Sequence, residues 1–280
     1  MPFTPSHAVV ALPLLRTRLV PAALAIGAMT PDLPLFTRGL GPGYLFTHSA
    51  ANVVYTALIA LALLLIWRVV LRPGLVALAP AALARRLPAD WALSGAATAR
   101  DALRGRGGRS GPWLLAVSLV LGVLSHIGWD LFTHDGRWGV EVLPALQQMW
   151  GPLPGYKWLQ HGSSVIGLLV IAGFALRWLR HRPARPLTHR TPGWLRWLWM
   201  LALPALLGVA WVLGSAASGP DVTMQQLAYR TLPAASGLWG ALTLGLCALI
   251  VTIRRGPRPT DEVARTTPAT LASAPQERRW

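Results

Sequence analysis

The stretch "PWLLAVSLVLGVLSHIGWDLFTH", residues 112–134, decides the fold class of this chain. Its first thirteen residues are almost all apolar. At a rise of about 1.5 Å per residue, the whole stretch is long enough to cross a bilayer as one helix. Its last ten residues carry His126, Asp130 and His134, which are spaced four residues apart and so project from one helix face. The stretch therefore predicts a membrane-spanning helix that ends in a row of potential metal ligands.

The composition of the chain indicates the same class. Hydrophobic residues make up 53% of the 280 residues and charged residues only 13%, whereas about a quarter of the residues in a soluble domain are charged. Five stretches are long enough to span a bilayer: Ala50–Leu71, Pro112–Thr133, Gly162–Leu179, Gly193–Ala217 and Leu232–Ile253. The sequence therefore predicts an all-α polytopic membrane protein with about five transmembrane helices.

The N-terminal segment 7–29 is apolar but is interrupted by the basic letters "RTR" and by Pro21. No basic stretch precedes its apolar run, so it does not resemble a signal peptide. The pieces Ala8–Leu15 and Leu19–Met29 are each too short to cross the bilayer. We expect them to form a re-entrant helical hairpin, which enters the membrane and returns to the same side.

The net charge of +16 is unevenly distributed. Segments 68–109, 177–196 and 254–280 hold eight, six and six of the 26 lysines and arginines. Because short basic loops stay in the cytoplasm, this asymmetry indicates membrane topology, and no nucleic-acid partner is expected. It predicts a flexible cytoplasmic loop over residues 72–111, a cytoplasmic C-terminus, and the histidine motifs outside.

The same criteria divide the chain into three parts. Residues 1–180 are predicted to form a membrane domain that carries the histidine and aspartate motifs, and residues 181–253 to add two transmembrane helices. Residues 254–280, rich in Pro, Thr, Ala and Arg, are predicted to form a flexible cytoplasmic tail. The single cysteine, Cys247, excludes an intrachain disulfide.

Ligand-type side chains collect at the ends of the predicted helices on the outer side. Ionisable groups within a span cost about 2.5–3.5 kcal/mol on insertion scales, so a group of them indicates function. One histidine alone would more often be an interfacial residue. Seven residues belong to this group: His7, Asp32, His48, His126, Asp130, His134 and His161.

These residue types predict a site for a divalent metal. Imidazole and carboxylate ligands suit Zn²⁺, and the lack of thiolate ligands argues against a purely structural zinc site. Seven ligands are too many for one tetrahedral ion, and two or three ions that share a bridging carboxylate would use all of them. The expected number of ions is one to three. Such clusters supply a hydroxide nucleophile near neutral pH and bind phosphate through an in-line displacement.

Five motifs in fixed order carry a family resemblance: "MPFTPSHA", "TPDLP", "FTHSA", "SHIGWDLFTH" and "QHGSS". From Met1 to about Gly167, the chain resembles the bacterial membrane family called domain of unknown function 4184. That family resembles in turn the predicted membrane-bound metal-dependent hydrolases, and more distantly the zinc phospholipase C and single-strand nuclease superfamily.

The distant likeness implies roles for the seven residues. Taken in chain order, they match the superfamily's ligand order. Asp130 would bridge two ions, and Asp32 would ligate or act near the attacking water, so these two are the implied catalytic residues. Two departures weaken the match: Val165 stands where the final acidic ligand would fall, and the N-terminal tryptophan ligand is absent. Asp135 and Glu141 are possible substitutes.

The leading functional interpretation is a membrane-bound hydrolase of phosphate esters at the outer surface of the bacterial cytoplasmic membrane. Its partners would be the lipid bilayer and a lipid or phosphate-ester substrate. The alternatives are a non-enzymatic metal-binding membrane protein and an ion or metal transporter. A transport path requires polar residues across the bilayer, whereas residues 112–124 are almost entirely apolar, which favours a site at one surface.

Overall fold

The computed structural model describes residues 3–105, 108–186, 191–219 and 221–255. The described chain is helical apart from short segments, among them two paired antiparallel strands, β1 (Met149–Trp150) and β2 (Leu153–Pro154). Five of its helices are long and apolar enough to cross a membrane. The all-α polytopic prediction is therefore confirmed. The predicted tail 254–280 lies outside the described residues, except for its first two positions.

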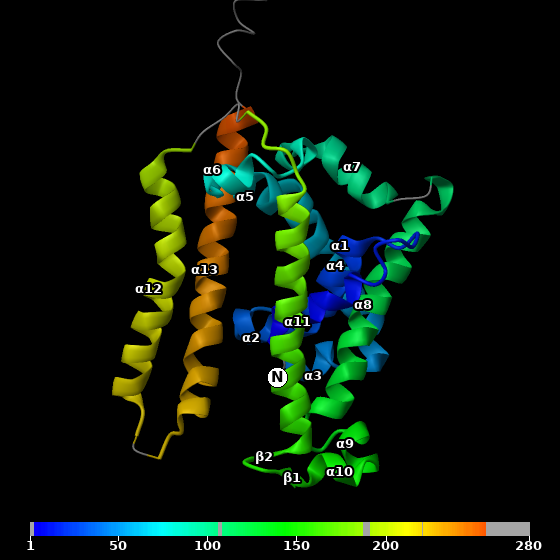
Figure 1. Cartoon of the computed structure of the whole chain (residues 1–280), viewed down its shortest axis with the longest axis vertical. Helices are drawn as coiled ribbons and strands as arrows, with labels where there is room; N and C mark the ends of the chain where they lie inside the picture. Colours follow the sequence, from blue (N-terminus) through cyan, green and yellow to red (C-terminus); the bar gives the residue numbers. More distant parts are fainter. Residues whose placement is uncertain (1–2, 106–107, 187–190, 220, 256–280) are drawn as a thin grey trace, which may run out of the picture.

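The five spanning segments lie roughly along the long axis of the molecule (Figure 1). The first combines α4 (Val53–Ile66), the π-helix η4 (Trp67–Leu71) and α5 (Arg72–Leu78). The others are α8 (Gly111–Thr133), α11 (Gly155–Arg180), α12 (Gly193–Ala217) and α13 (Met224–Arg255).

Three of these helices extend beyond the predicted spans. The first continues from Leu71 to Leu78, α11 begins at Gly155 rather than Gly162, and α13 begins at Met224 rather than Leu232. The hydropathy pattern marks only the apolar part of a helix. Backbone hydrogen bonding continues into polar turns, and a proline in the first turn of α5 does not interrupt it.

The N-terminal segment folds back on itself, as predicted. The 3₁₀ helix η1 (Thr4–Ala11) packs on α1 (Pro21–Met29), which leads through η2 (Thr30–Asp32) into α2 (Leu33–Thr37). His7 and Asp32, at opposite ends of this hairpin, supply ligand-type atoms within 4.8 Å of each other. The two helical pieces start at residues 4 and 21 rather than 8 and 19.

A pair of glycines brings α1 against α8. A Cβ on Gly27 would lie 2.5 Å from the Leu119 carbonyl oxygen, and one on Gly122 would lie 2.4 Å from the Leu24 carbonyl oxygen. Neither position therefore accepts a side chain without a backbone shift. This close approach, typical of membrane helix pairs, places the backbone of α1 beside the polar face of α8.

The prediction of a flexible loop over residues 72–111 is corrected. Its described part forms α5, α6 (Ala81–Ala84), η5 (Ala89–Ala92), α7 (Ala96–Arg104) and η6 (Gly108–Ser110). Arg68 binds Asp101 of α7 at 2.6 Å, and Arg72 donates to the Asp90 carbonyl oxygen at 2.9 Å. These bonds join the loop to the end of the first span. We call this side of the molecule the arginine end.

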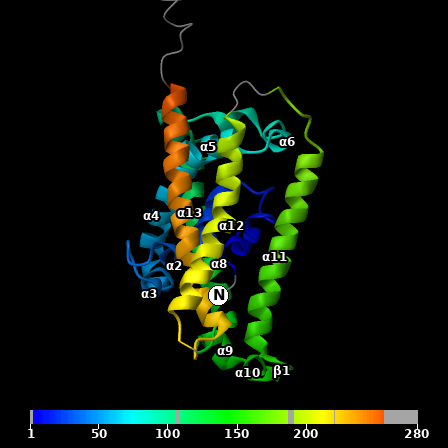
Figure 2. The same ribbon diagram turned by 90° about the vertical axis from the view of Figure 1, so that its left-hand side faces the viewer.

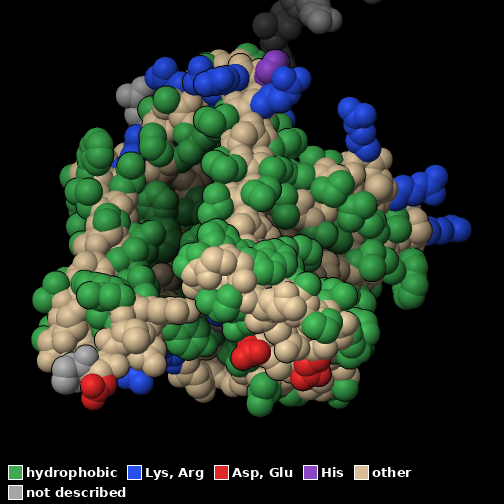
Figure 3. Space-filling model, turned by 60° about the horizontal axis from the view of Figure 1, so that its bottom comes forward, with side chains coloured by type: hydrophobic (Ala, Val, Ile, Leu, Met, Phe, Trp, Pro, Cys, Tyr) green, Lys and Arg blue, Asp and Glu red, His purple; other side chains and the backbone are tan. Residues whose placement is uncertain are grey.

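The opposite side, which we call the acidic end, is formed by the β1–β2 hairpin, α9 (Trp138–Val142) and α10 (Pro144–Gln147). Figure 3 shows Asp and Glu side chains near this end and most Lys and Arg side chains at the other. In the two perpendicular views, α11 stands apart from the α12–α13 pair (Figures 1 and 2). Helix α13 packs on α2, α5 and η4, whereas α11 packs on η1 and α8.

Candidate metal centre

Four ligand-type side chains from three segments converge inside the helical bundle. Asp32 is the last residue of η2, His48 follows α3 (Tyr44–Thr47), and His126 and Asp130 lie one turn apart on α8. All four are buried, with exposed fractions of 0%, 5%, 0% and 3% in that order. The glycine contact between α1 and α8 and the return of the hairpin bring Asp32 to the two α8 residues.

The distances from the two histidines to each other and to the two carboxylates match those between ligands of one ion. The two histidine Nε2 atoms lie 3.2 Å apart. Each Nε2 atom lies 3.6 Å from Asp32 Oδ1 and 3.5 Å from Asp130 Oδ2. Ligand atoms about 2.0–2.2 Å from a tetrahedral zinc ion are separated by about 3.3–3.6 Å. The two histidine nitrogens are therefore spaced from each other and from each carboxylate as ligands of one ion would be, and His48, His126 and Asp130 form one group of possible ligands within 4.8 Å.

Backbone carbonyl groups set the orientation of both imidazole rings. His126 Nδ1 lies 2.7 Å from the Ala28 carbonyl oxygen, and His48 Nδ1 lies 3.0 Å from that of Tyr44. A carbonyl oxygen only accepts, so each Nδ1–H donates and, in a neutral ring, each Nε2 carries a lone pair. This is the arrangement by which outer hydrogen bonds prepare histidines to bind metal.

The centre leaves its acceptor atoms without donors. Asp32 Oδ1 and both carboxylate oxygens of Asp130 are buried and have no hydrogen-bond partner among the described residues. Buried acceptors without partners are costly. A divalent cation would satisfy all of these atoms, so the residues present fit a metal ion with hard oxygen and imidazole nitrogen ligands.

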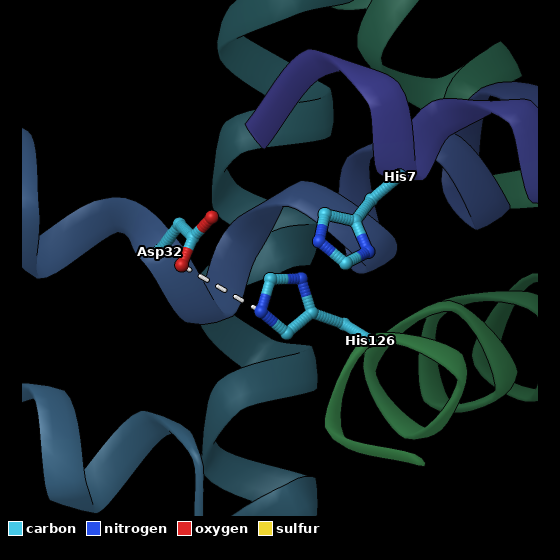
Figure 4. A group of neighbouring side chains, drawn as sticks. All are labelled: His7, Asp32 and His126. Carbon is cyan, nitrogen blue, oxygen red and sulfur yellow. Dashed lines mark ion pairs between the residues drawn. The ribbon is translucent and has the colours of Figure 1, made fainter. Parts of the chain in front are cut away.

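His7 lies directly against this centre (Figure 4). Its ring stacks on that of His126 with a centroid distance of 4.0 Å, and its buried Nε2 has no described hydrogen-bond partner. Burial, and then the neighbouring His126, lower the pKa of His7 to about 4, so the ring is neutral at neutral pH. With Asp32 and His126 it forms a second group of three possible ligands within 4.8 Å.

The protonation of His48 depends on the two carboxylates. Burial alone would lower the pKa of His48, but the adjacent Asp130 and Asp32 carboxylates outweigh burial and raise it above its usual value. A proton on His48 therefore partly offsets the negative charge of the centre. A metal ion that binds here must displace that proton.

His134 supports the centre from one turn further along the chain. Its Nδ1 lies 3.3 Å from the Asp130 carbonyl oxygen and 3.6 Å from Asp130 Oδ1. Its Nε2 lies 3.2 Å from the side-chain nitrogen of Gln160, which is fully buried. That amide nitrogen can only donate, so His134 Nε2 accepts the hydrogen bond. In the neutral ring the proton is then on Nδ1, the nitrogen that faces Asp130. His134 therefore contacts the Asp130 backbone and places its Nδ1 3.6 Å from the Asp130 carboxylate.

Two residues in this network are not of ligand type. Thr4 Oγ1 donates to Asp32 Oδ2 at 2.6 Å and leaves Oδ1 to face the histidines. Gln160 holds His134 as described above. Both lie within the motifs "MPFTPSHA" and "QHGSS", which is the one signal that could have indicated them.

The last motif contributes differently from the prediction. His161 is exposed and belongs to neither of the two groups of possible ligands in the described chain. Its neighbour Ser164 instead accepts a hydrogen bond from the Phe3 backbone at 2.9 Å and so ties η1 to α11. Asp135 and Glu141 are exposed as well. Of the seven predicted ligands, five converge, His134 supports them and His161 lies outside.

A small cavity adjoins the Asp130 side of the centre. It has a volume of about 30 Å³ and is lined by His48, Ile127, Asp130, Leu131 and Arg137. This volume is sufficient for one water molecule, and the cavity supplies several polar partners. The guanidinium group of Arg137 is thus placed where an anion or an activated water would approach the centre.

The chain belongs to the family described as "Domain of unknown function (DUF4184)", whose sequence pattern matches residues 1–253. The match extends well beyond Gly167, so the last two spanning helices are part of the family pattern and not an addition to it. No curated protein and no solved structure matches the chain.

Proposed function

We propose that this DUF4184 member is a membrane-bound, metal-dependent hydrolase of phosphate esters, with Asp32, His48, His126 and Asp130 as its principal metal ligands. One observation carries the proposal. Two buried histidine nitrogens lie 3.2 Å apart, each lies 3.5–3.6 Å from one buried oxygen of Asp32 and one of Asp130, and these carboxylate atoms have no described hydrogen-bond donor.

A bound divalent ion would supply Lewis-acid polarisation of a phosphoryl oxygen and lower the pKa of a water molecule. Asp130 would bind the ion through Oδ2 and orient the attacking water in the 30 Å³ cavity through Oδ1. Arg137, which lines this cavity, would balance the charge of the phosphate. The water oxygen forms a bond to phosphorus, the ester P–O bond breaks, and the leaving alcohol takes up a proton.

The metal stoichiometry in this proposal is one or two zinc ions. The four principal ligands account for the first ion. His7 and Asp32 are the side chains left for a second ion, because His126 would bind the first ion through Nε2 and donates its Nδ1–H to the Ala28 carbonyl oxygen. Asp32 would then lie between the two ions, held through its other oxygen by Thr4.

The proposed location is the bacterial cytoplasmic membrane, with the acidic end outside and the C-terminus in the cytoplasm. The arginines at the opposite end support this orientation by the positive-inside rule (Figure 3). A transport role has less support. On the arginine side of the centre, α8 buries Leu115, Leu119 and Val123 against other apolar residues.

One observation favours a second candidate, a structural metal site. Four protein ligands complete a tetrahedral shell, whereas catalytic zinc sites keep a position open for water or substrate. In that case the ion would join the N-terminal hairpin to α8. Its removal would unfold the N-terminal region, and no ester would be hydrolysed.

The test is to purify the full chain, determine its metal content, and measure release of phosphate or alcohol from a panel of phosphate esters. We expect bound zinc and hydrolysis in the wild type, loss of both in Asp130→Asn, and no effect of His181→Ala at the distant arginine end. Bound metal without hydrolysis, together with a large fall in Tm on chelation, would support the structural site. A wild-type protein that binds no metal would contradict both candidates.

A further inference from the structure

A large apolar cavity lies on the other side of α1 from α8. Its volume is about 600 Å³, and its walls come from α1, α2, α4 and η4. On α1 the cavity is lined by Ala22, Ala25, Ile26 and Met29, whose spacing places them on one helix face. The opposite face of the same helix carries Gly27 and Ala28 toward α8. A single helix therefore separates the cavity from α8 and supplies a carbonyl group to the metal centre.

The cavity has two polar ends. At the end nearer the acidic side it is lined by Thr4 and Thr30, and Thr4 is the residue that donates to Asp32. The cavity wall is thus one hydrogen bond away from a principal ligand of the candidate centre. Arg68 and Arg72 line the other end, roughly 7 and 13 Å further along the first span than Leu63 at the helical rise per residue.

The arginines at the far end already have acidic partners. Arg68 Nη2 lies 2.6 Å from Asp101 Oδ2, and Arg72 Nη1 lies 3.7 Å from Asp90 Oδ2. Their charges are therefore balanced within the protein. An anionic group is better placed at the opposite end, next to a centre that would hold a divalent ion. The cavity thus has one end suited to a phosphate and an apolar interior.

The elements that form the cavity belong to the membrane-embedded part of the molecule. Leu63, Ile66 and Leu71 lie in the first spanning segment, and Leu33 and Phe36 complete the wall from α2. The volume is in the range of ligand sites, which are mostly apolar with a few polar groups. At this depth the available apolar ligand is a lipid hydrocarbon chain.

We propose that the substrate is a lipid phosphate ester, one hydrocarbon chain of which occupies this cavity with the phosphate at the Thr4 end. This inference rests on the proposed hydrolase function and specifies its substrate class. The two cavities relate differently to the centre: Asp130 itself lines the water-sized cavity, whereas Asp32 is linked to the apolar cavity through the hydrogen bond from Thr4, which lines it. Water would attack from the first, and the lipid alcohol would leave toward the second.

The first experiment compares two substrates in the full-length protein, hexadecyl phosphate and the water-soluble para-nitrophenyl phosphate. Ala25→Trp fills the cavity, and Ala205→Trp on the exposed surface of α12 is the matched control. We expect Ala25→Trp to lower turnover of hexadecyl phosphate about tenfold or more, with para-nitrophenyl phosphate little changed. Leu63→Trp repeats the test from the opposite wall if Ala25→Trp disturbs folding. Equal loss for both substrates in both variants would overturn the assignment of the cavity.

The second experiment is independent of activity. An alkyl phosphate with a diazirine at the end of its chain is photolysed with the wild type and with Ala25→Trp. We expect labelling near Trp67 and Leu71 in the wild type, and its loss in Ala25→Trp but not in Ala205→Trp. Labelling of this kind without hydrolysis of either ester would overturn the proposed hydrolase and leave the lipid site in place. Labelling confined to residues outside the cavity lining, or labelling unaffected by Ala25→Trp, would overturn the lipid site.

Discussion

The two nitrogens of His126 have separate tasks. Nδ1 lies 2.7 Å from the Ala28 carbonyl oxygen, while Nε2 faces His48, Asp32 and Asp130. The backbone of α1 thus fixes the tautomer of a ligand on α8, 98 residues further along the chain. Asp32 is oriented in the same way by Thr4, which donates to its Oδ2. Each principal ligand except the Asp130 side chain therefore has a hydrogen bond that directs its ligating atom toward the centre.

Thr4 provides a direct test of this outer support. Thr4→Val keeps the shape of the side chain and removes the hydroxyl group that donates to Asp32 Oδ2. Loss of such a partner lowers metal affinity by about 10–100-fold. We expect this loss in a competition titration with a zinc chelator, with no change for the matched variant Thr17→Val in the exposed turn. Equal affinities in Thr4→Val and the wild type would show that Asp32 does not hold the ion.

The pH dependence of metal binding tests the state of His48. Because the pKa of His48 is raised in the metal-free protein, the ring holds its proton to higher pH than a free histidine. A metal ion must displace that proton, so affinity should rise with pH until His48 has titrated, and fall as pH decreases. His7, with a pKa of about 4, adds nothing to this dependence near neutral pH. Calorimetry in two buffers measures the protons released when zinc binds. If no proton is released, His48 does not hold a proton that the metal ion displaces.

The sequence predicted the principal ligands because histidine and aspartate within apolar helices have few structural roles. It did not predict Thr4 or Gln160, since hydroxyl and amide side chains are common at helix ends and acquire a role only through their contacts. It also ranked His161 with the ligands, because that residue directly precedes the third predicted span and so lies at its outer end. The actual rotation of α11 turns His161 outward and Gln160 inward, and no local pattern fixes that rotation.

At the scale of elements, the contact between α1 and α8 determines the site. Gly27 and Gly122 allow the two backbones to meet, and this contact sets the position of the Ala28 carbonyl group relative to His126. The apolar pattern predicted both helices and the hairpin. It did not predict which face of α1 meets α8, because the hairpin is apolar on all sides and the choice depends on small residues at both positions.

Gly122→Val tests this contact. The new Cβ atom would lie 2.4 Å from the Leu24 carbonyl oxygen, so α1 must move away from α8. Overpacking of this kind costs about 1–3 kcal/mol, and the shift should also weaken zinc binding. Gly128→Ala on the same helix is the control, because its Cβ meets no atom within 4 Å. Measurements of Tm and zinc affinity should separate the two variants; similar values for both would contradict the role of the glycine contact.

At the scale of the whole molecule, the arginine end and the acidic end lie on opposite sides of five apolar helices. The proposed orientation places the acidic end, and with it the access to Asp130, outside the cytoplasm. Topology reporters fused at Gly151 and after residue 255 should therefore report opposite sides, with Gly151 outside. Both reporters on one side would contradict the five-span topology, and an inverted result would reverse the orientation alone.

The central claim is that Asp32, His48, His126 and Asp130 hold a divalent metal ion inside the bundle. The most direct measurement is the number of metal ions per chain, determined by elemental analysis of protein purified without added metal. We predict about one or two zinc ions in the wild type and in the control His181→Ala. We predict a fall of at least one ion in both His126→Ala and Asp130→Ala, each still folded by circular dichroism. Equal metal content in all four proteins, or no metal in the wild type, would contradict the account.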